Sequence, residues 1–273
     1  NDARPLREVY NQLQTIRPYY NFPDVDIDRY MIDGEYRQVF IAARELTQEN
    51  LNEQAQTWTN KNLRYTHGYG LAVSAVNEIT AEGQPEYLVQ NIPPVGALNI
   101  EVPQIYFGEN QYNSVLVNTK VTEFDYPDNP NDDNYVYEGS SGIPFQGWKR
   151  LLFSWDEGSL RYFVSGQVTE ETQLLQTRNI YDRVKRIAPF LQLDRDAYPV
   201  IRDDGSVTWL IDAYTMTERY PFSDSIGYNF NYIRNSVKIA IDAYTGEVTF
   251  YLVDDTDPLS LTYKNMFPTL FTT

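Results

Sequence analysis

The chain contains one histidine, His67, and no cysteine. A His-rich metal centre and a Cys–His catalytic pair are therefore excluded within this chain, because both need residues that the sequence lacks. A Ser-His-Asp triad would have to use His67, but no Gly-x-Ser-x-Gly nucleophile motif accompanies it. Because Gly68 and Gly70 follow it closely, we predict that His67 lies in an exposed loop and has a structural role.

Paired carboxylates are the remaining route to catalysis. Glycoside hydrolysis needs two carboxyl groups at a defined separation, next to aromatic rings that hold the sugar. The chain has 38 acidic residues, 23 tyrosines, 13 phenylalanines and 4 tryptophans, but this abundance names no pair, because a sequence gives no distance between side chains. A hydrolase that acts on a cell-envelope polymer is therefore the alternative hypothesis, with its catalytic residues unassigned.

Residues 126–142 form a polar segment rich in Asp, Asn, Pro and Gly. Asp125, Asp128, Asp132 and Asp133 offer the hard oxygen ligands that calcium prefers. The Asp-x-Asp-x-Asp-Gly register of a calcium loop, with its distal Glu, is missing. We predict a poorly ordered acidic loop, with calcium binding as the alternative and no other cofactor.

A basic cluster lies in the C-terminal half and consists of Arg178, Arg183, Lys185 and Arg186. The helical spacing of Ile180, Val184, Ile187 and Leu191 predicts that this segment is a helix. We interpret the basic residues as its solvated face, paired with neighbouring carboxylates.

The charge balance is strongly acidic, with 22 Lys and Arg against 38 Asp and Glu and a formal net charge of −16. This field repels phosphate backbones, so nucleic acid is not expected as a partner. At 42% hydrophobic and 15% aromatic residues, the chain is too apolar to be disordered. No stretch approaches the ~20 apolar residues of a membrane-spanning helix.

Local patterns predict both helices and hairpins. Apolar spacing predicts an amphipathic helix from Asp2 to Arg17 and a buried helix at Trp148, Leu151, Leu152 and Trp155. Alternation across short turns predicts three hairpins, which are residues 25–41 turning at Asp33-Gly34, residues 198–211 turning at Asp204-Gly205, and residues 237–253 turning at Thr245-Gly246. In the last hairpin we expect a common buried face for Ile239, Ile241, Phe250 and Leu252.

Weaker signals complete the prediction. They are a short polar helix at 52–63, strands at 102–107 and 114–124, and a helix N-terminus at Thr169, followed by Glu170 and Glu171. The pentapeptide Ile-Asp-Ala-Tyr-Thr occurs at 211–215 and 241–245, and we interpret it as a duplicated strand end.

Together these elements predict an α+β fold, with mixed or antiparallel sheets built from hairpins and packed against amphipathic helices. The acidic loop at 126–142 is the best candidate for a boundary. It would divide residues 1–273 into a helix plus hairpin subdomain at 1–125 and a second subdomain at 143–273, in which a helical segment precedes two hairpins.

Several sequence blocks resemble one family, the bacterial multi-pass membrane proteins of uncharacterised protein family 0182. The most specific block spans 230–251 and contains Asn-Tyr-Ile-Arg-Asn-Ser-Val-Lys and Asp-Ala-Tyr-Thr-Gly-Glu-Val-Thr-Phe-Tyr. Shorter blocks are Tyr-Thr-His-Gly-Tyr-Gly at 65–70, Ile-Tyr-Phe-Gly-Glu at 105–109, Glu-Phe-Asp-Tyr-Pro at 123–127 and Arg-Tyr-Pro-Phe-Ser at 219–223. The similarity runs nearly from end to end.

The resemblance implies several N-terminal membrane helices followed by a large extracytoplasmic region, of which this chain would be the central part. Because the chain begins at Asn1 rather than at a methionine, we also expect it to be part of a longer protein. We therefore predict an extracytoplasmic binding or assembly module of a cell-membrane protein. Its expected partners are its own membrane helices and another membrane or envelope protein. The family implies no chemistry, so no catalytic residue is carried over.

Overall fold

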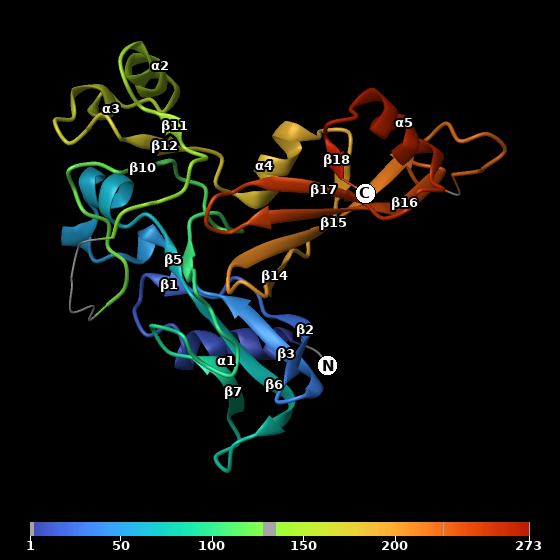
Figure 1. Ribbon diagram of the computed structural model, residues 1–273, viewed down its shortest axis with the longest axis horizontal. Coiled ribbons are helices and arrows are strands. Elements are labelled where there is room, and N and C mark those ends of the chain that lie inside the picture. Colours follow the sequence, from blue (N-terminus) through green and yellow to red (C-terminus); the bar gives the residue numbers. More distant parts are fainter. Residues whose placement is uncertain (1–2, 128–134, 226, 273) are drawn as a thin grey trace.

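The computed structural model describes residues 3–127, 135–225 and 227–272. The fold is α+β, as predicted, and two large sheets dominate it (Figure 1). The helices are α1 (Arg4–Leu13), α2 (Trp148–Asp156), α3 (Arg161–Val164), α4 (Ile180–Ile187) and α5 (Pro258–Met266). Three shorter helical turns are η1 (Gln48–Asn50), η2 (Glu53–Ala55) and η3 (Asn60–Arg64).

The first large sheet is five-stranded and antiparallel, in the order β2-β3-β6-β7-β8. Its strands are β2 (Asp26–Ile32), β3 (Glu35–Ala43), β6 (Leu71–Ile79), β7 (Pro85–Gln90) and β8 (Val95–Gly96). The predicted turn joins β2 to β3, with φ of 53° at Asp33 and 81° at Gly34, as the favoured two-residue hairpin turn requires. Helix α1 covers one face of this sheet. There the hydroxyl oxygen of buried Tyr10 lies 2.7 Å from Ser74 Oγ.

The second large sheet is six-stranded and mixed. Its order is β13-β15-β16-β17-β18, with β14 also paired to β15 and with β17 and β18 parallel. Its strands are β13 (Gln192–Leu193), β14 (Tyr198–Ile201), β15 (Val207–Thr217), β16 (Tyr232–Asp242), β17 (Val248–Leu252) and β18 (Phe271–Thr272). Both predicted hairpins are present, and Ile239 lies opposite Phe250 on a buried face. Helices α4 and α5 lie near this sheet in Figure 1.

Three small sheets accompany the large ones. The first has the order β10-β12-β11, and the other two are the pairs β1-β4 and β5-β9. Their strands are β10 (Val115–Val117), β11 (Ile143–Pro144), β12 (Gln173–Leu175), β1 (Tyr20–Asn21), β4 (Glu45–Leu46), β5 (Gly68–Tyr69) and β9 (Gln104–Ile105). The largest buried cluster contains residues from both sides of the predicted boundary, including Val39, Val73, Ile211 and Ile239. The two-subdomain division stays a prediction.

Several local predictions are corrected by the structure. No helix begins at Thr169, because its hydroxyl donates instead to the carbonyl of Asn118 and the chain continues into β12. The strands predicted at 102–107 and 114–124 shorten to β9 and β10. The first Ile-Asp-Ala-Tyr-Thr lies inside β15 whereas the second runs from the end of β16 into a turn, so it is no duplicated strand end.

Helix α2 forms as predicted, but its apolar side is not buried. Trp148 is 71% exposed, Leu151 and Leu152 are each 55% exposed, and Trp155 is 89% exposed. Apolar residues at helical spacing show which side of a helix is hydrophobic, but not whether another element covers it. Among the described residues, no helix has both the length and the apolar character that crossing a membrane requires.

Candidate functional site

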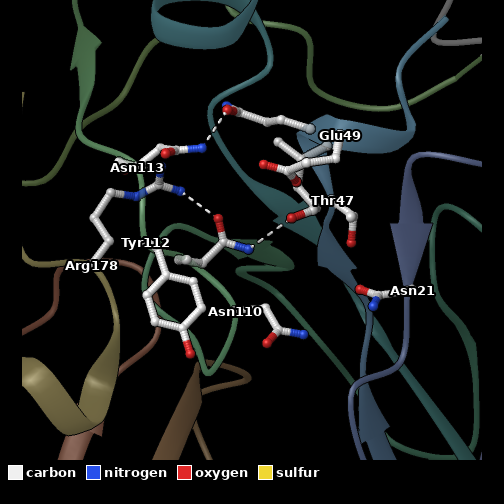
Figure 2. Close-up of a pocket in the computed structure, with 10 residues that line it drawn as sticks. Asn21, Thr47, Glu49, Asn110, Tyr112, Asn113 and Arg178 are labelled. Carbon is white, nitrogen blue, oxygen red and sulfur yellow. Dashed lines mark hydrogen bonds between the residues drawn. The ribbon is translucent and has the colours of Figure 1, made fainter.

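A polar pocket of about 240 Å³ lies between the β1-β4 pair and the segment 110–113. Figure 2 shows Arg178 and Tyr112 on one side, with Asn21 and Thr47 opposite. The pocket walls consist mainly of amide and hydroxyl side chains, which are Asn21, Thr47, Gln48, Asn110, Gln111, Tyr112 and Asn113. Such groups can both donate and accept hydrogen bonds.

Glu45 holds one wall of this pocket from behind. Its buried carboxylate accepts hydrogen bonds from the backbone N–H groups of Glu109 at 2.8 Å and Asn110 at 2.9 Å, and from the side-chain amide of Gln111 at 3.1 Å. Burial raises the pKa of Glu45, although these hydrogen bonds oppose the shift. The close approach of Glu45 also requires a glycine at position 108, because a Cβ there would lie 2.5 Å from the Glu45 carboxylate.

Arg178 holds the same segment from the other side and is 1% exposed. Its guanidinium donates to the carbonyls of Tyr106, Asn113 and Thr66 and to Gln111 Oε1, at distances of 2.5 to 3.0 Å. Burial lowers the pKa of Arg178 to about 10, which leaves it charged at neutral pH. The interpretation of Arg178 as part of a solvated face is therefore wrong.

Two pocket residues carry buried polar atoms without a hydrogen-bond partner. They are Asn21 Oδ1 and Thr47 Oγ1. Buried polar groups are normally hydrogen-bonded, so these two atoms are exceptions, and both are enclosed by protein rather than exposed to the pocket. Gln48, by contrast, is fixed, since it donates to the carbonyls of Lys61 and Tyr65 and accepts from Asn113 Nδ2.

The rest of the basic cluster divides between the interior and the surface. Arg183 is half-buried, with its guanidinium carbon 4.6 Å from the centre of the Phe107 ring and its Nε donating to the Gly246 carbonyl. Lys185 and Arg186 are exposed, as predicted. The cluster thus supplies two structural arginines and two surface charges.

His67 is buried rather than exposed, with 2% of its surface accessible. It precedes β5 and lies between the Tyr106 and Tyr135 rings, at centroid distances of 4.6 and 5.3 Å. Its Nδ1 is 2.9 Å from Thr66 Oγ1 and 3.8 Å from Glu123 Oε2, and its Nε2 is 3.5 Å from Asp125 Oδ1. Glycines beside a histidine indicate a turn, but they do not show what packs over it.

The geometry places a proton on Nδ1 of His67. The hydroxyl of Thr66 has one proton and donates it to Glu123 Oε2, so the imidazole Nδ1 must donate to Thr66. Burial alone would lower the pKa of His67, but Asp125 and Glu123 outweigh burial and raise it. No serine takes part in these contacts, and the arrangement is a buried ion network rather than a triad.

Acidic groups gather elsewhere in the described residues. Asp24, Asp26 and Asp196 each offer a carboxylate oxygen, and the three oxygens lie within 4.8 Å of one another, a spacing that could hold a hard cation. Burial and the charge of Glu109 raise the pKa of Asp26 to about 8. Of the residues considered for calcium, Asp125 lies beside His67 and accepts from Gln104 Nε2 at 2.9 Å, whereas Asp128, Asp132 and Asp133 lie outside the described residues.

Comparison with known proteins identifies the family of this chain. The model of an uncharacterised protein family (UPF0182) matches residues 1–273. The chain belongs to this family. Its UPF0182 relatives include proteins from Alkaliphilus metalliredigens, 52% identical, and Pelotomaculum thermopropionicum, 47% identical, each aligned over 99% of this chain.

A relative from Trichodesmium erythraeum is 42% identical over 99% of this chain. The chain spans 29% to 32% of the length of these three relatives. No solved structure matches it. The resemblance in the sequence blocks is thus confirmed at the level of the family, whose name states no activity.

Sequence reasoning did not single out the amide-lined pocket. Asn21, Thr47 and Tyr112 carry no motif and lie up to 91 residues apart, counted from 21 to 112. The one usable signal is the block at 105–109, because Gly108 in it is required by the close approach of Glu45.

Proposed function

We propose that this UPF0182 region is a binding module that takes a neutral, hydroxyl-rich ligand, such as a sugar unit, in the amide-lined pocket. The observation that carries the proposal is the lining of the pocket, which consists mainly of neutral amide and hydroxyl side chains. A ligand with several hydroxyls can donate to and accept from such side chains at once.

The charge of the pocket favours a neutral ligand. Arg178 lines the pocket but is buried, Glu45 with the opposite charge is buried behind the wall, and the exposed Glu49 is the one carboxylate among the described lining residues. Ligand sites for drug-sized molecules have volumes of roughly 300–1,000 Å³, so a pocket of about 240 Å³ fits a smaller group such as one sugar ring. The exposed Tyr112 ring can cover the face of that ring.

Binding is favoured over hydrolysis because the described residues of the lining include no second carboxylate. A glycosidase needs two carboxyl groups around the scissile bond, and Glu49 alone does not supply them.

We also propose that the module faces the outside of the cell as part of a multi-pass membrane protein. The support is the resemblance described above, together with the large part of each relative that lies outside this chain. Its own N-terminal membrane helices and an envelope protein are then the proposed partners. The charge of −16 disfavours nucleic acid.

The pocket proposal is tested with glucose and N-acetylglucosamine as neutral probes and glycerol 3-phosphate as a charged probe. Saturation-transfer NMR and calorimetry should show binding of a neutral sugar with a Kd of roughly millimolar order, which corresponds to about −4 kcal/mol. Tyr112→Ala should weaken binding about fivefold or more through loss of the ring contact. Tyr36→Ala is the matched control, because Tyr36 is 70% exposed and Tyr112 is 69% exposed.

Two results with the parent protein contradict the proposal, and a third comes from the variants. One is the absence of binding by either sugar at high millimolar concentration, and the other is preferential binding of the phosphate. Equal loss of affinity in Tyr112→Ala and Tyr36→Ala would place the bound sugar outside the pocket.

A further inference from the structure

The hairpin formed by α2 and α3 exposes an unusually apolar surface. The apolar face consists of Trp148, Leu151, Leu152, Trp155, Leu160 and Val164, and these side chains are between 55% and 89% exposed. Leu151, Leu152, Trp155 and Leu160 also line a shallow groove of about 510 Å³. Contiguous exposed apolar surface of this kind marks an interaction site in a soluble domain.

The apolar face is held in place by contacts on the opposite side of the hairpin. There Phe153 and Tyr162 pack into a small core with Phe145 and Leu174. Arg150 ties α2 to α3, because its Nη2 donates to the carbonyls of Phe163 at 2.5 Å and Ser165 at 3.0 Å. The face is therefore formed before anything binds to it, and covering it requires no refolding.

The side-chain types favour a bilayer interface over a protein. Trp148 is the first residue of α2, and Trp155 lies one residue before its end. Tryptophan prefers the boundary between headgroups and acyl chains, and an amphipathic helix with Trp and Leu on one face and basic residues beside it lies in that boundary.

The local charge also fits a membrane surface better than the rest of the chain does. Residues 147–166 contain Lys149, Arg150 and Arg161 against Asp156 and Glu157, which gives 3 − 2 = +1 in a chain of −16. The hairpin also lies at an outer end of the molecule, away from the five-stranded sheet (Figure 1). It can therefore touch a flat surface while the five-stranded sheet stays distant (Figure 1).

We propose that the α2–α3 hairpin inserts its apolar face into the interfacial region of a lipid bilayer and so docks this region on a membrane. This site is separate from the amide-lined pocket, and it holds whether or not that pocket binds a sugar.

The test is sedimentation of the 273-residue chain with phosphatidylcholine vesicles and, separately, with vesicles that also contain phosphatidylglycerol. The chain should bind the neutral vesicles. At low salt the phosphatidylglycerol vesicles should bind less of it, because the net charge of −16 opposes approach to an anionic surface. The fluorescence of Trp148 and Trp155 should shift to the blue and be quenched by brominated lipid, while Trp209, which is 1% exposed, stays unquenched.

The Leu152→Ser and Trp155→Ser double variant should lower the partition coefficient by more than about tenfold, because each removed side chain contributes apolar burial. Both residues are exposed, so the circular dichroism spectrum and melting temperature should not change. Ile79→Ser is the control, since Ile79 is 74% exposed on β6, and it should bind vesicles as the parent does.

Several outcomes overturn the proposal. They are no sedimentation at millimolar lipid, equal sedimentation of the double variant, or absence of quenching by brominated lipid. A dimer in light scattering that the double variant abolishes, with the tryptophans shielded in it, would instead assign the face to a second copy of the chain.

Discussion

His67 lies in a buried site whose charges come from distant parts of the sequence. Glu123 and Asp125 face its two ring nitrogens at 3.8 and 3.5 Å, and Tyr106 donates to the same Glu123 oxygen as Thr66. A buried imidazolium is stable only when carboxylates compensate it, so these residues act as one unit. The structural role predicted for His67 is thereby explained by its place in the interior.

The first prediction concerns the pH dependence of this unit. The pKa of His67 is raised in the folded protein, because Asp125 and Glu123 outweigh the opposing effect of burial. Its charge contribution to the free energy of unfolding is therefore complete below the unfolded pKa of about 6.5 and is lost as pH rises through the higher folded pKa. The difference in stability between the parent and His67→Gln should be largest below that pH, as urea denaturation across a pH series can measure. A difference that grows with rising pH would contradict a charged His67.

The second prediction concerns Asp26. As with His67, its contribution to stability falls as pH rises, but here the substitution is expected to stabilise the protein. Burial, followed by the charge of Glu109, raises the pKa of Asp26 from 3.8 to about 8. The folded state therefore loses stability as pH rises from the unfolded pKa toward that value. Asp26→Asn should stabilise the protein at pH values near 8 and have little effect near 4. Each 1 kcal/mol gained in the free energy of unfolding should raise Tm by about 2–4 °C. Calorimetry at the two pH values measures this, and equal effects at both would contradict it.

At the scale of elements, the β16-β17 hairpin shows how local coding and long-range packing agree. Val237 pairs with Leu252, Ile239 with Phe250 and Ile241 with Val248. Asp242 stabilises the turn, because its side chain accepts hydrogen bonds from the N–H groups of Tyr244 and Thr245. Gly246 has φ of 71°, and a Cβ there would lie 2.6 Å from the Phe107 ring.

Substitutions in this hairpin should show how much its buried core residue and its turn each contribute to stability. Phe250 is 1% exposed, so Phe250→Ala should cost about 3–5 kcal/mol through lost burial and an unfilled cavity. Gly246→Val should be harmful for two reasons, which are its positive φ and the clash with Phe107. Glu247→Gln on the exposed turn is the control and should be nearly neutral. Thermal unfolding measures all three, and a Phe250→Ala protein that melts within a degree or two of the parent would make the hairpin peripheral.

For the whole molecule, the chain is about 30% of the length of its relatives, so its position relative to a membrane is a property of the full-length protein. We expect a tagged full-length protein to fractionate with membranes, because the family resemblance implies upstream membrane helices. Protease added to intact or wall-stripped cells should then cleave within this region. Protection until the membrane is lysed would place the region on the cytoplasmic side and contradict the proposed location.

The sequence by itself determined the strands and turns that depend on neighbours along the chain. The turns at Asp33-Gly34, Asp204-Gly205 and Thr245-Gly246 follow each from a few residues, and alternation shows which side of a strand is apolar. The helix at 148–156 was predicted for the same reason, because a repeat of three to four residues is a local property.

Only the tertiary structure decided what covers these elements and which polar groups meet. Arg178 is buried because the carbonyls of Tyr106, Asn113 and Thr66, between 65 and 112 residues away, converge on its guanidinium. The pocket exists because Glu45 and Arg178 hold one segment against the β1-β4 pair, and the apolar face of α2 is exposed because no described element packs on it. Burial, charge pairing and cavities are relations between distant residues, and local periodicity carries no information about them.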